Sequence, residues 1–315
     1  MTIARSRQIS LQDTAYYHVG SRCVRRAFLC GEDAHSGQSY EHRRQWVVDR
    51  LGQLSRLFAI GICAYAVMSN HYHLVLKVDA EQAQGWSERE VAERWAGLFQ
   101  WPLLVRRWYQ GDTLIEPELS VVQGLIEEWR ERLYSISWFV RRLNEGLARQ
   151  ANQEDSCKGH FWEGRFKSQA LLSESALLAC MAYVELNPVR AKLAETPEES
   201  DYTSISQRLG RAQTTELPPL LLPFAKQGEP ESLPYTFSDY LALVDWTGRA
   251  IRDDKRGHIP EALSPILERL QLDGEDWLKQ VKLFKRSGIR AIGHVAARER
   301  YAHHCGQRRC HQPTH

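Results

Sequence analysis

Three short stretches in the N-terminal half of the chain have strand character, and in two of them apolar and polar residues alternate. This two-residue period is typical of strands that bury one face. A fourth stretch with strand character follows at 166–172. The dipeptide Ser69-Asn70 separates the second stretch from the third and predicts a turn, so these two strands are expected to form a hairpin. The three stretches cover residues 16–23, 60–68 and 71–78, of which the first and the third alternate.

Other segments repeat their apolar residues with the 3.6-residue period of a helix. Residues 40–58 predict one helix, and residues 121–152 predict a single long helix whose apolar side chains we interpret as core packing. Residues 79–120 are interpreted as an insertion with a helix at 88–99. Strand, helix, hairpin, helix and strand in this order predict an α+β fold, with an antiparallel sheet and helices on one face.

The composition changes after Gly210. Residues 211–235 are rich in proline and are interpreted as a linker between a first domain at 1–210 and a helical accessory region at 236–315. The basic residues of that region predict a separable unit that contacts nucleic-acid phosphates; the alternative is that it packs on the sheet and completes the fold. Its end matches no strong zinc-binding pattern, and we expect it to be weakly ordered. The residues concerned are Ser238, Ser264 and Asp273 as helix caps, Lys279, Lys282, Lys285, Arg286 and Arg290 as basic positions, and His303, His304, Cys305, Cys310, His311 and His315 at the end.

Composition sets further limits. With 315 residues, of which 43% are hydrophobic and 25% charged, the chain has the profile of a globular protein of one large or two smaller domains. No apolar run is long enough to cross a bilayer, and residues 1–8 lack the apolar core of a signal peptide. We therefore expect a cytoplasmic protein without membrane contacts, whose seven cysteines are reduced.

His71 and His73 stand two residues apart in the predicted second strand of the hairpin. Side chains alternate along a strand, so both imidazoles are expected on the same face and Tyr72 on the other. Two imidazoles side by side can bind one divalent metal. The alternative is that both are ordinary strand residues, and for an isolated pair of this kind it is the better interpretation.

A possible partner for this pair lies on the helix predicted after Ser173, which is expected to be its N-cap. Tyr183 and Asn187 are four residues apart and therefore share a face of that helix. A phenol can act as a nucleophile, and a carboxamide oxygen can be a third metal ligand. Pro188 predicts that the helix kinks or ends near Asn187. If Asn187 points away from the histidines, Glu185 or Gln169 becomes the candidate for the third ligand.

The net charge of +2 does not by itself argue for nucleic acid. Basic side chains nevertheless gather in local clusters on both sides of the Tyr183 segment, with aromatic residues among them. This combination is expected where phosphates are bound and bases stack; the alternative is solvated charges around core aromatic residues. The candidate nucleic-acid contacts are Arg22, Arg25, Arg26, Lys158, Trp162, Arg165, Lys167 and Arg190.

Four segments taken together resemble the HUH single-strand nucleases, and among them the repeat-associated tyrosine transposases. His71-Tyr72-His73 is similar to the histidine pair of that family, and the segment from Tyr183 to Arg190 resembles its nucleophile helix. The other two segments are 17–22, similar to the first strand, and 159–168, similar to the stretch before the nucleophile helix. The resemblance covers the chain before Gly210. It implies a ferredoxin-like sheet with the histidines on a central strand and the Tyr183 helix across the open face.

The resemblance implies an enzyme that cuts and rejoins single-stranded DNA near hairpins or palindromic repeats. Tyr183 would attack the phosphate, keep the 5′ phosphate and release a 3′ hydroxyl, while His71, His73 and Asn187 hold Mg²⁺ or Mn²⁺. Such a protein would be a monomer or homodimer and would associate with the nucleoid when bound to DNA. Two alternatives remain open, namely a metal-dependent nuclease without a covalent intermediate and a non-catalytic DNA- or RNA-binding protein.

Overall fold

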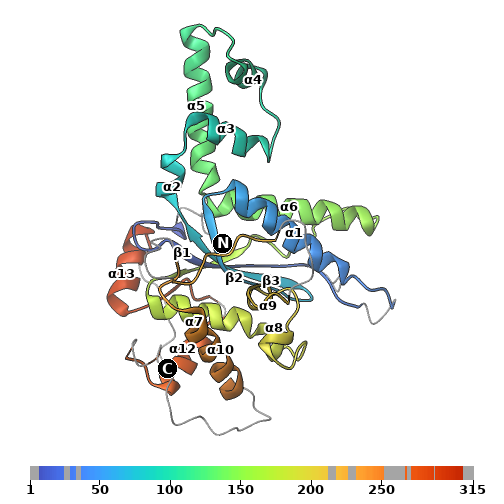
Figure 1. The fold of residues 1–315 in the computed structure, drawn as a ribbon, viewed down its shortest axis with the longest axis vertical. Helices are drawn as coiled ribbons and strands as arrows, with labels where there is room; N and C mark the ends of the chain where they lie inside the picture. The colour runs from blue at the N-terminus through green and yellow to red at the C-terminus, as the bar shows by residue number, and fades with distance from the viewer. Residues whose placement is uncertain are drawn as a thin grey trace.

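The computed structural model describes residues 7–24, 29–32, 37–211, 218–225, 232–251, 267, 271–286 and 288–307. A five-stranded sheet lies at the centre, with the strand order β2-β3-β1-β4-β5 (Figure 1). Neighbouring strands are antiparallel except for β4 and β5, which run parallel. This architecture confirms the predicted α+β class. The strands are β1 (Tyr16–Arg22), β2 (Ile60–Val67), β3 (His71–Val78), β4 (Lys167–Leu171) and β5 (Ala291–Ile292).

Helices cover both faces of the sheet, and not one face as the sequence predicted (Figure 1). On the first face, α1 (His42–Leu57) and α6 (Ile136–Glu154) pack on side chains such as Tyr72 and Leu74. On the second face lies α7 (Glu174–Glu185), the helix that was expected to cross the sheet there. The helices α10 (Phe237–Ile251) and α12 (Gly274–Leu283) pack on the outer side of α7.

The position of α7 explains its composition and its ends. Ten of its residues, from Ala176 to Glu185, are buried. The helix lies between the sheet and two other helices and therefore has no face exposed to solvent. Ser173 is its N-cap, as predicted, since its Oγ accepts a hydrogen bond from the Ala176 backbone nitrogen at 3.1 Å. The helix ends at Glu185, and a short α8 (Asn187–Arg190) follows, which confirms the break predicted from Pro188.

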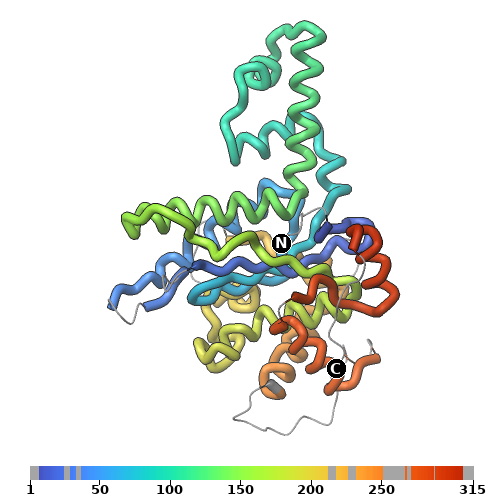
Figure 2. Tube along the Cα trace, turned by 180° about the vertical axis from the view of Figure 1, so that it is seen from behind, coloured from blue at the N-terminus to red at the C-terminus, as the bar shows by residue number. Residues whose placement is uncertain are grey.

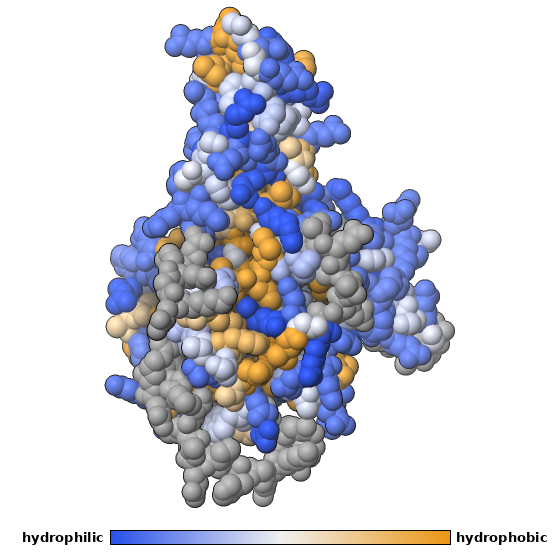
Figure 3. Space-filling view, in the orientation of Figure 1, coloured by the Kyte–Doolittle hydropathy of each residue, from blue (hydrophilic) through white to orange (hydrophobic). Residues whose placement is uncertain are grey.

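The predicted insertion forms a helical arm that stands away from the sheet (Figure 1). The long helix predicted over 121–152 is in fact two helices, because Ser135 is extended, with φ −88° and ψ 117°, and interrupts it. The apolar period continues across this break, so the sequence pattern did not reveal it. Figure 3 shows the arm as largely hydrophilic, with a hydrophobic group at its far end. The arm consists of α2 (Ala80–Gly85), α3 (Glu88–Ala96), α4 (Leu103–Gln110) and α5 (Glu116–Leu133).

The chain beyond Gly210 is built into the fold. Residues 218–225 run beside β2, where the Leu222 nitrogen donates to the Ile62 carbonyl at 2.9 Å. Further on, β5 extends the sheet at β4, a strand that the sequence analysis did not predict. Asp273 caps α12 as expected, whereas Ser264 lies outside the described residues. These contacts favour the alternative in which this region completes the sheet.

The C-terminal part also contacts the start of the chain. His303 and His304, expected in a weakly ordered tail, instead belong to α13 (Val295–His304). Figure 2 shows α13 in red beside the N-terminal segment in blue. The Tyr301 hydroxyl donates to the Gln8 carbonyl at 2.5 Å, and His304 pairs with Asp13 at 2.9 Å. Cys310, His311 and His315 lie outside the described residues.

A short 3-10 helix covers Pro197–Glu199, and α9 covers Ser204–Arg208. Of the helices that the structure describes, none is long and apolar enough to cross a membrane.

Candidate active site

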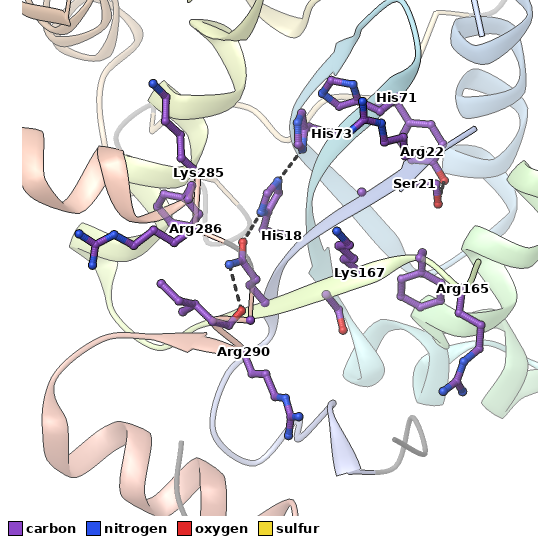
Figure 4. A pocket seen from close by; sticks show the side chains of 18 of the residues that line it. His18, Ser21, Arg22, His71, His73, Arg165, Lys167, Lys285, Arg286 and Arg290 are labelled. Atoms are coloured by element: carbon purple, nitrogen blue, oxygen red, sulfur yellow. Dashed lines mark hydrogen bonds between the residues drawn. The ribbon is translucent and has the colours of Figure 1, made fainter. Parts of the chain in front are cut away.

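A cavity of about 760 Å³ opens on the second face of the sheet, against α7 (Figure 4). Its walls come from parts of the chain that are distant in sequence. The strands β1, β3 and β4 supply the floor, the segment 163–166 one side, and α7 together with the segment after α12 the other side. The lining side chains discussed below are His18, Arg22, His71, His73, Arg165, Lys167, Gln169, Tyr183, Phe284, Lys285, Arg286 and Arg290.

Strand register brings the polar residues of this floor together. On β1, Gly20 lies opposite His73 and Arg22 opposite His71, while His18 lies opposite Gln169 of β4. Gly20 leaves room for the imidazole, since a Cβ there would lie 3.2 Å from the Tyr72 carbonyl and 3.4 Å from His73 Nδ1.

His71 and His73 face the cavity side by side, as predicted, with ring centroids 4.8 Å apart. Each ring uses Nδ1 for a hydrogen bond within the protein: His71 with Asn70 Oδ1 at 2.6 Å and His73 with His18 Nε2 at 3.0 Å. Among the described residues, neither Nε2 atom has a hydrogen-bond partner. Both rings therefore have a nitrogen that can bind a ligand.

Burial keeps these imidazoles neutral. It lowers the pKa of His71 to about 4, helped by the nearby positive charge of Arg22. Burial also lowers the pKa of His73 well below its ordinary value, and the neighbouring His18, His71 and Arg190 act in the same direction. The neutral imidazole is the form that binds a metal.

His18 is a third histidine of the site, which the sequence analysis did not single out. It is 6% exposed, and its Nδ1 lies 2.6 Å from Gln169 Oε1. Figure 4 shows the resulting row of hydrogen bonds from His73 through His18. Alternation along β1 places His18 on the same face as Gly20 and Arg22, but the pairing of β1 with β4 depends on residues 151 positions apart.

Tyr183 reaches the same cavity from α7. Its ring centroid lies 5.6 Å from that of His73 and 5.6 Å from that of Phe284, and the side chain is 7% exposed. Burial raises the pKa of the Tyr183 phenol, while Arg190 and the Asn187 amide act in the opposite direction. The guanidinium carbon of Arg190 lies 5.1 Å from the Tyr183 ring centroid. Ionisation of this phenol therefore depends on positive charge beside it.

Two polar groups beside Tyr183 lack partners. Both terminal nitrogens of Arg190 and the Nδ2 atom of Asn187 are buried without a hydrogen bond of normal geometry. Buried polar atoms are usually paired. Such unpaired groups next to a tyrosine and two neutral histidines indicate a place where an anion and a cation can bind.

The candidates for a third metal ligand differ in position. Asn187 lies beside Tyr183 but is not among the residues that line the cavity. Glu185 is fully buried on another side of α7, where it accepts hydrogen bonds from Ser204 Oγ at 2.6 Å and the Ile205 nitrogen at 3.1 Å, so it is no ligand for this site. The Oε1 atom of Gln169 is engaged by His18.

Two imidazole nitrogens are the donors that the cavity offers to a divalent cation. In the described part of the chain, no three His, Cys, Asp or Glu side chains are grouped as metal ligands. Imidazole suits transition-metal cations, and a carbonyl oxygen suits Mg²⁺ and Mn²⁺. The Asn187 amide, the candidate oxygen donor, lies beside Tyr183 and outside the lining of the cavity.

The cavity has a basic rim. Of the residues predicted to contact nucleic acid, Arg22, Arg165 and Lys167 line it, and Glu163 is the one acid among the lining residues that the structure describes. Three basic residues of the C-terminal region join them. In Figure 4, Arg22 lies beside the histidine pair, while the side chains of Arg165 and Arg290 extend away from it. The C-terminal contributors are Lys285, Arg286 and Arg290.

Other predicted contacts lie elsewhere. Trp162 packs against Tyr72 on the opposite face of the sheet, with ring centroids 5.7 Å apart, and its indole N–H donates to the Asn144 carbonyl at 2.9 Å. Its aromatic character thus serves core packing. Lys158 is exposed and does not line the cavity. Arg25 and Arg26 lie outside the described residues.

Comparisons with known proteins give few matches. No protein-family model matches the chain, and no curated protein matches it. Among solved structures, the chain is similar to one described as a REP-associated tyrosine transposase bound to a REP hairpin. The similarity covers 74% of this chain and 97% of that chain, with 11% sequence identity and a TM-score of 0.39. A likeness at this level assigns no function, which has to be argued from the site.

Proposed function

We propose that this protein is a metal-dependent transesterase that cuts and rejoins single-stranded DNA near hairpin or palindromic repeats. The observation that carries the proposal is the meeting, in one basic cavity, of Tyr183 with two neutral histidines whose Nε2 atoms are free. The cleavage product would be a covalent 5′-phosphotyrosine.

The reaction is a transfer of one phosphodiester bond. The Tyr183 oxygen attacks phosphorus, the P–O3′ bond breaks, and the phenolic proton passes through solvent to the leaving 3′ oxygen. Attack by a 3′ hydroxyl on the phosphotyrosine reverses these changes, so rejoining requires no nucleotide cofactor. One phosphoester bond replaces another, so the protein is required only to position the tyrosine and the phosphate and to stabilise the charge that develops on the phosphate.

Each residue of the site has a defined part. Arg190 would donate its two unpaired nitrogens to the phosphoryl oxygens and favour the Tyr183 phenolate. His71, His73 and Asn187 would hold Mg²⁺ or Mn²⁺, and such a cation would neutralise charge on the phosphate and orient it. Arg22 and Lys167, on the cavity rim, would bind neighbouring phosphates of the strand.

The test is covalent trapping. Wild-type protein incubated with a labelled single-stranded DNA hairpin and Mn²⁺ should form an adduct that survives denaturing electrophoresis. Tyr183→Phe should form none, while its DNA affinity changes by less than about tenfold, because a lost hydrogen bond is worth about 1 kcal/mol. Tyr109→Phe, on α4 of the arm, is the matched control and should behave as wild type.

Each alternative gives a distinct outcome. An adduct that persists in Tyr183→Phe would place the nucleophile elsewhere. Cleaved DNA without any adduct in the wild type would identify a hydrolase, and binding without cleavage would identify a DNA-binding protein. Full adduct yield in excess EDTA would exclude the metal.

A further inference from the structure

We infer that Gln169 and His18 form a positioning relay that fixes the tautomer of His73, so that its Nε2 lone pair faces the cavity. The inference rests on the proposed function only for the statement that a metal uses this lone pair. The tautomer itself follows from the donors and acceptors of a row of hydrogen bonds. The row runs from the Ile289 carbonyl through Gln169 and His18 to His73.

The relay begins at a backbone carbonyl of the C-terminal region. Gln169 Nε2 lies 3.0 Å from the Ile289 carbonyl oxygen, which can only accept. The atom facing it must therefore be the amide nitrogen. This fixes the orientation of the amide and turns Oε1 to His18, at 2.6 Å from Nδ1.

The next hydrogen bond fixes the tautomer of His18. An amide oxygen only accepts, so His18 Nδ1 must carry the hydrogen. His18 is 6% exposed, and its described contacts are with Gln169, His73, Tyr183 and Phe284, none of which is an acid. A buried imidazole without an anion is neutral. Its Nε2 therefore carries a lone pair and can only accept.

The last hydrogen bond fixes the tautomer of His73. Its Nδ1 lies 3.0 Å from His18 Nε2, so the hydrogen of this bond must come from His73 Nδ1. His73 Nε2 is left with a lone pair. The tautomer of His71, also on β3, is fixed separately by the hydrogen bond between its Nδ1 and Asn70 Oδ1. Groups that hold a ligating histidine by its other nitrogen commonly orient it and tune its basicity.

The first experiment needs no variant and no metal. Long-range ¹H–¹⁵N correlation spectra of the full chain with ¹⁵N-labelled histidine distinguish the two neutral tautomers. The expected result is hydrogen on Nδ1 in both His18 and His73. Hydrogen on His73 Nε2, or a mixture of tautomers, would overturn the relay.

The second experiment removes the acceptor. His18→Leu takes away the partner of His73 Nδ1 and should weaken Mn²⁺ binding, measured by titration calorimetry, by about 10- to 100-fold, the usual effect of losing such a supporting group. His18→Gln offers an amide oxygen instead and should restore most of the affinity. Gln169→Leu, which does not contact His73, should mix the tautomers of His18 and His73 and weaken binding less.

The outcomes separate the relay from the proposed function. Unchanged Mn²⁺ affinity in His18→Leu, with a native melting curve, would overturn the supporting role. If the wild type binds no Mn²⁺, the metal is lost from the proposed function, and the spectra of the wild type still decide whether the relay fixes the tautomer.

Discussion

At the scale of single residues, the charge on Arg190 is the least compensated feature of the site. Its two terminal nitrogens are buried without partners beside the Tyr183 ring. A buried unpaired charge lowers stability, and replacement by an apolar side chain of similar size is often neutral or stabilising. This guanidinium is therefore expected to lower the stability of the fold when no anion is bound, in line with the proposed contact between Arg190 and a phosphate.

Arg190→Met should accordingly separate activity from stability. Loss of the donor should slow adduct formation by about 10²- to 10³-fold, the usual effect of removing one donor to a developing oxyanion. The melting temperature should stay the same or rise. Arg149→Met, on the exposed side of α6 where the side chain is 76% exposed, is the control. An adduct rate in Arg190→Met equal to that of the control would exclude the proposed part of Arg190.

Asn187→Ala tests the third ligand. Because the amide is one of three protein ligands in the proposal, its removal should raise the Mn²⁺ concentration required for half-maximal adduct formation, and excess Mn²⁺ should restore the rate. DNA affinity, measured without metal, should stay near that of the wild type. A rate that is low at every Mn²⁺ concentration would instead point to the contact of Asn187 with Tyr183.

At the scale of elements, the junction between α7 and α9 holds the end of α7, the helix that carries Tyr183. The Glu185 carboxylate accepts hydrogen bonds from Ser204 and Ile205 at the first turn of α9, the favourable place for a negative charge on a helix. Burial nevertheless dominates and raises the pKa of Glu185 to about 7, against the action of those two hydrogen bonds. The junction is therefore sensitive to pH near neutrality.

The sign of this effect is fixed by linkage. The pKa of Glu185 rises from 4.5 to about 7 on folding, so in this window the folded protein binds a proton that the unfolded chain has released. The Glu185 contribution to the free energy of unfolding should fall as pH rises through the window, by about 3 kcal/mol in total, and then level off. Glu185→Gln should lack this fall. Urea unfolding of both proteins at several pH values measures the difference, and parallel curves would contradict it.

Local patterns determined most of the elements. The hairpin, the Ser173 cap and the break at Pro188 could be predicted because each depends on neighbouring residues. The break at Ser135 was missed because the apolar period runs through it, and β5 because two residues carry no period. His71, His73 and Tyr183 could be identified as candidate site residues because their spacing within one strand or one helix is also a local pattern.

The partners of the site residues could not be predicted. His18 contacts Gln169 and His73 through strand pairing over long sequence separations, which no local pattern encodes. From the sequence, Glu185 was a candidate for the third metal ligand. In the structure its carboxylate is hydrogen-bonded to Ser204 of α9. Trp162 has the composition of a stacking residue but lies in the packing against Tyr72.

At the scale of the molecule, the region beyond Gly210 packs against the rest of the fold. It covers the outer side of α7, extends β4 and contacts the start of the chain through α13. Its removal would expose a row of apolar side chains on α7 and the hydrogen-bonding edge of β4. Both are conditions for aggregation.

A chain ending at Gly210 should therefore be insoluble or unfolded, in contrast to the expectation for a separable accessory unit. A chain ending at Gln307 keeps every contact described above and is the control. Soluble expression, circular dichroism and the melting temperature provide the measurement. A folded 1–210 fragment that still forms the adduct would show that the C-terminal region is dispensable for the site.

The pairing of β5 with β4 has a consequence for synthesis on the ribosome. Residues 71–73 and Tyr183 leave the exit tunnel long before Ile289 and the β5 residues. Until those arrive, β4 has an open edge and Gln169 lacks the carbonyl that orients its amide. A nascent chain should thus carry His71, His73 and Tyr183 without an ordered centre, so that the proposed cleavage of DNA can begin only after β5 has been synthesised.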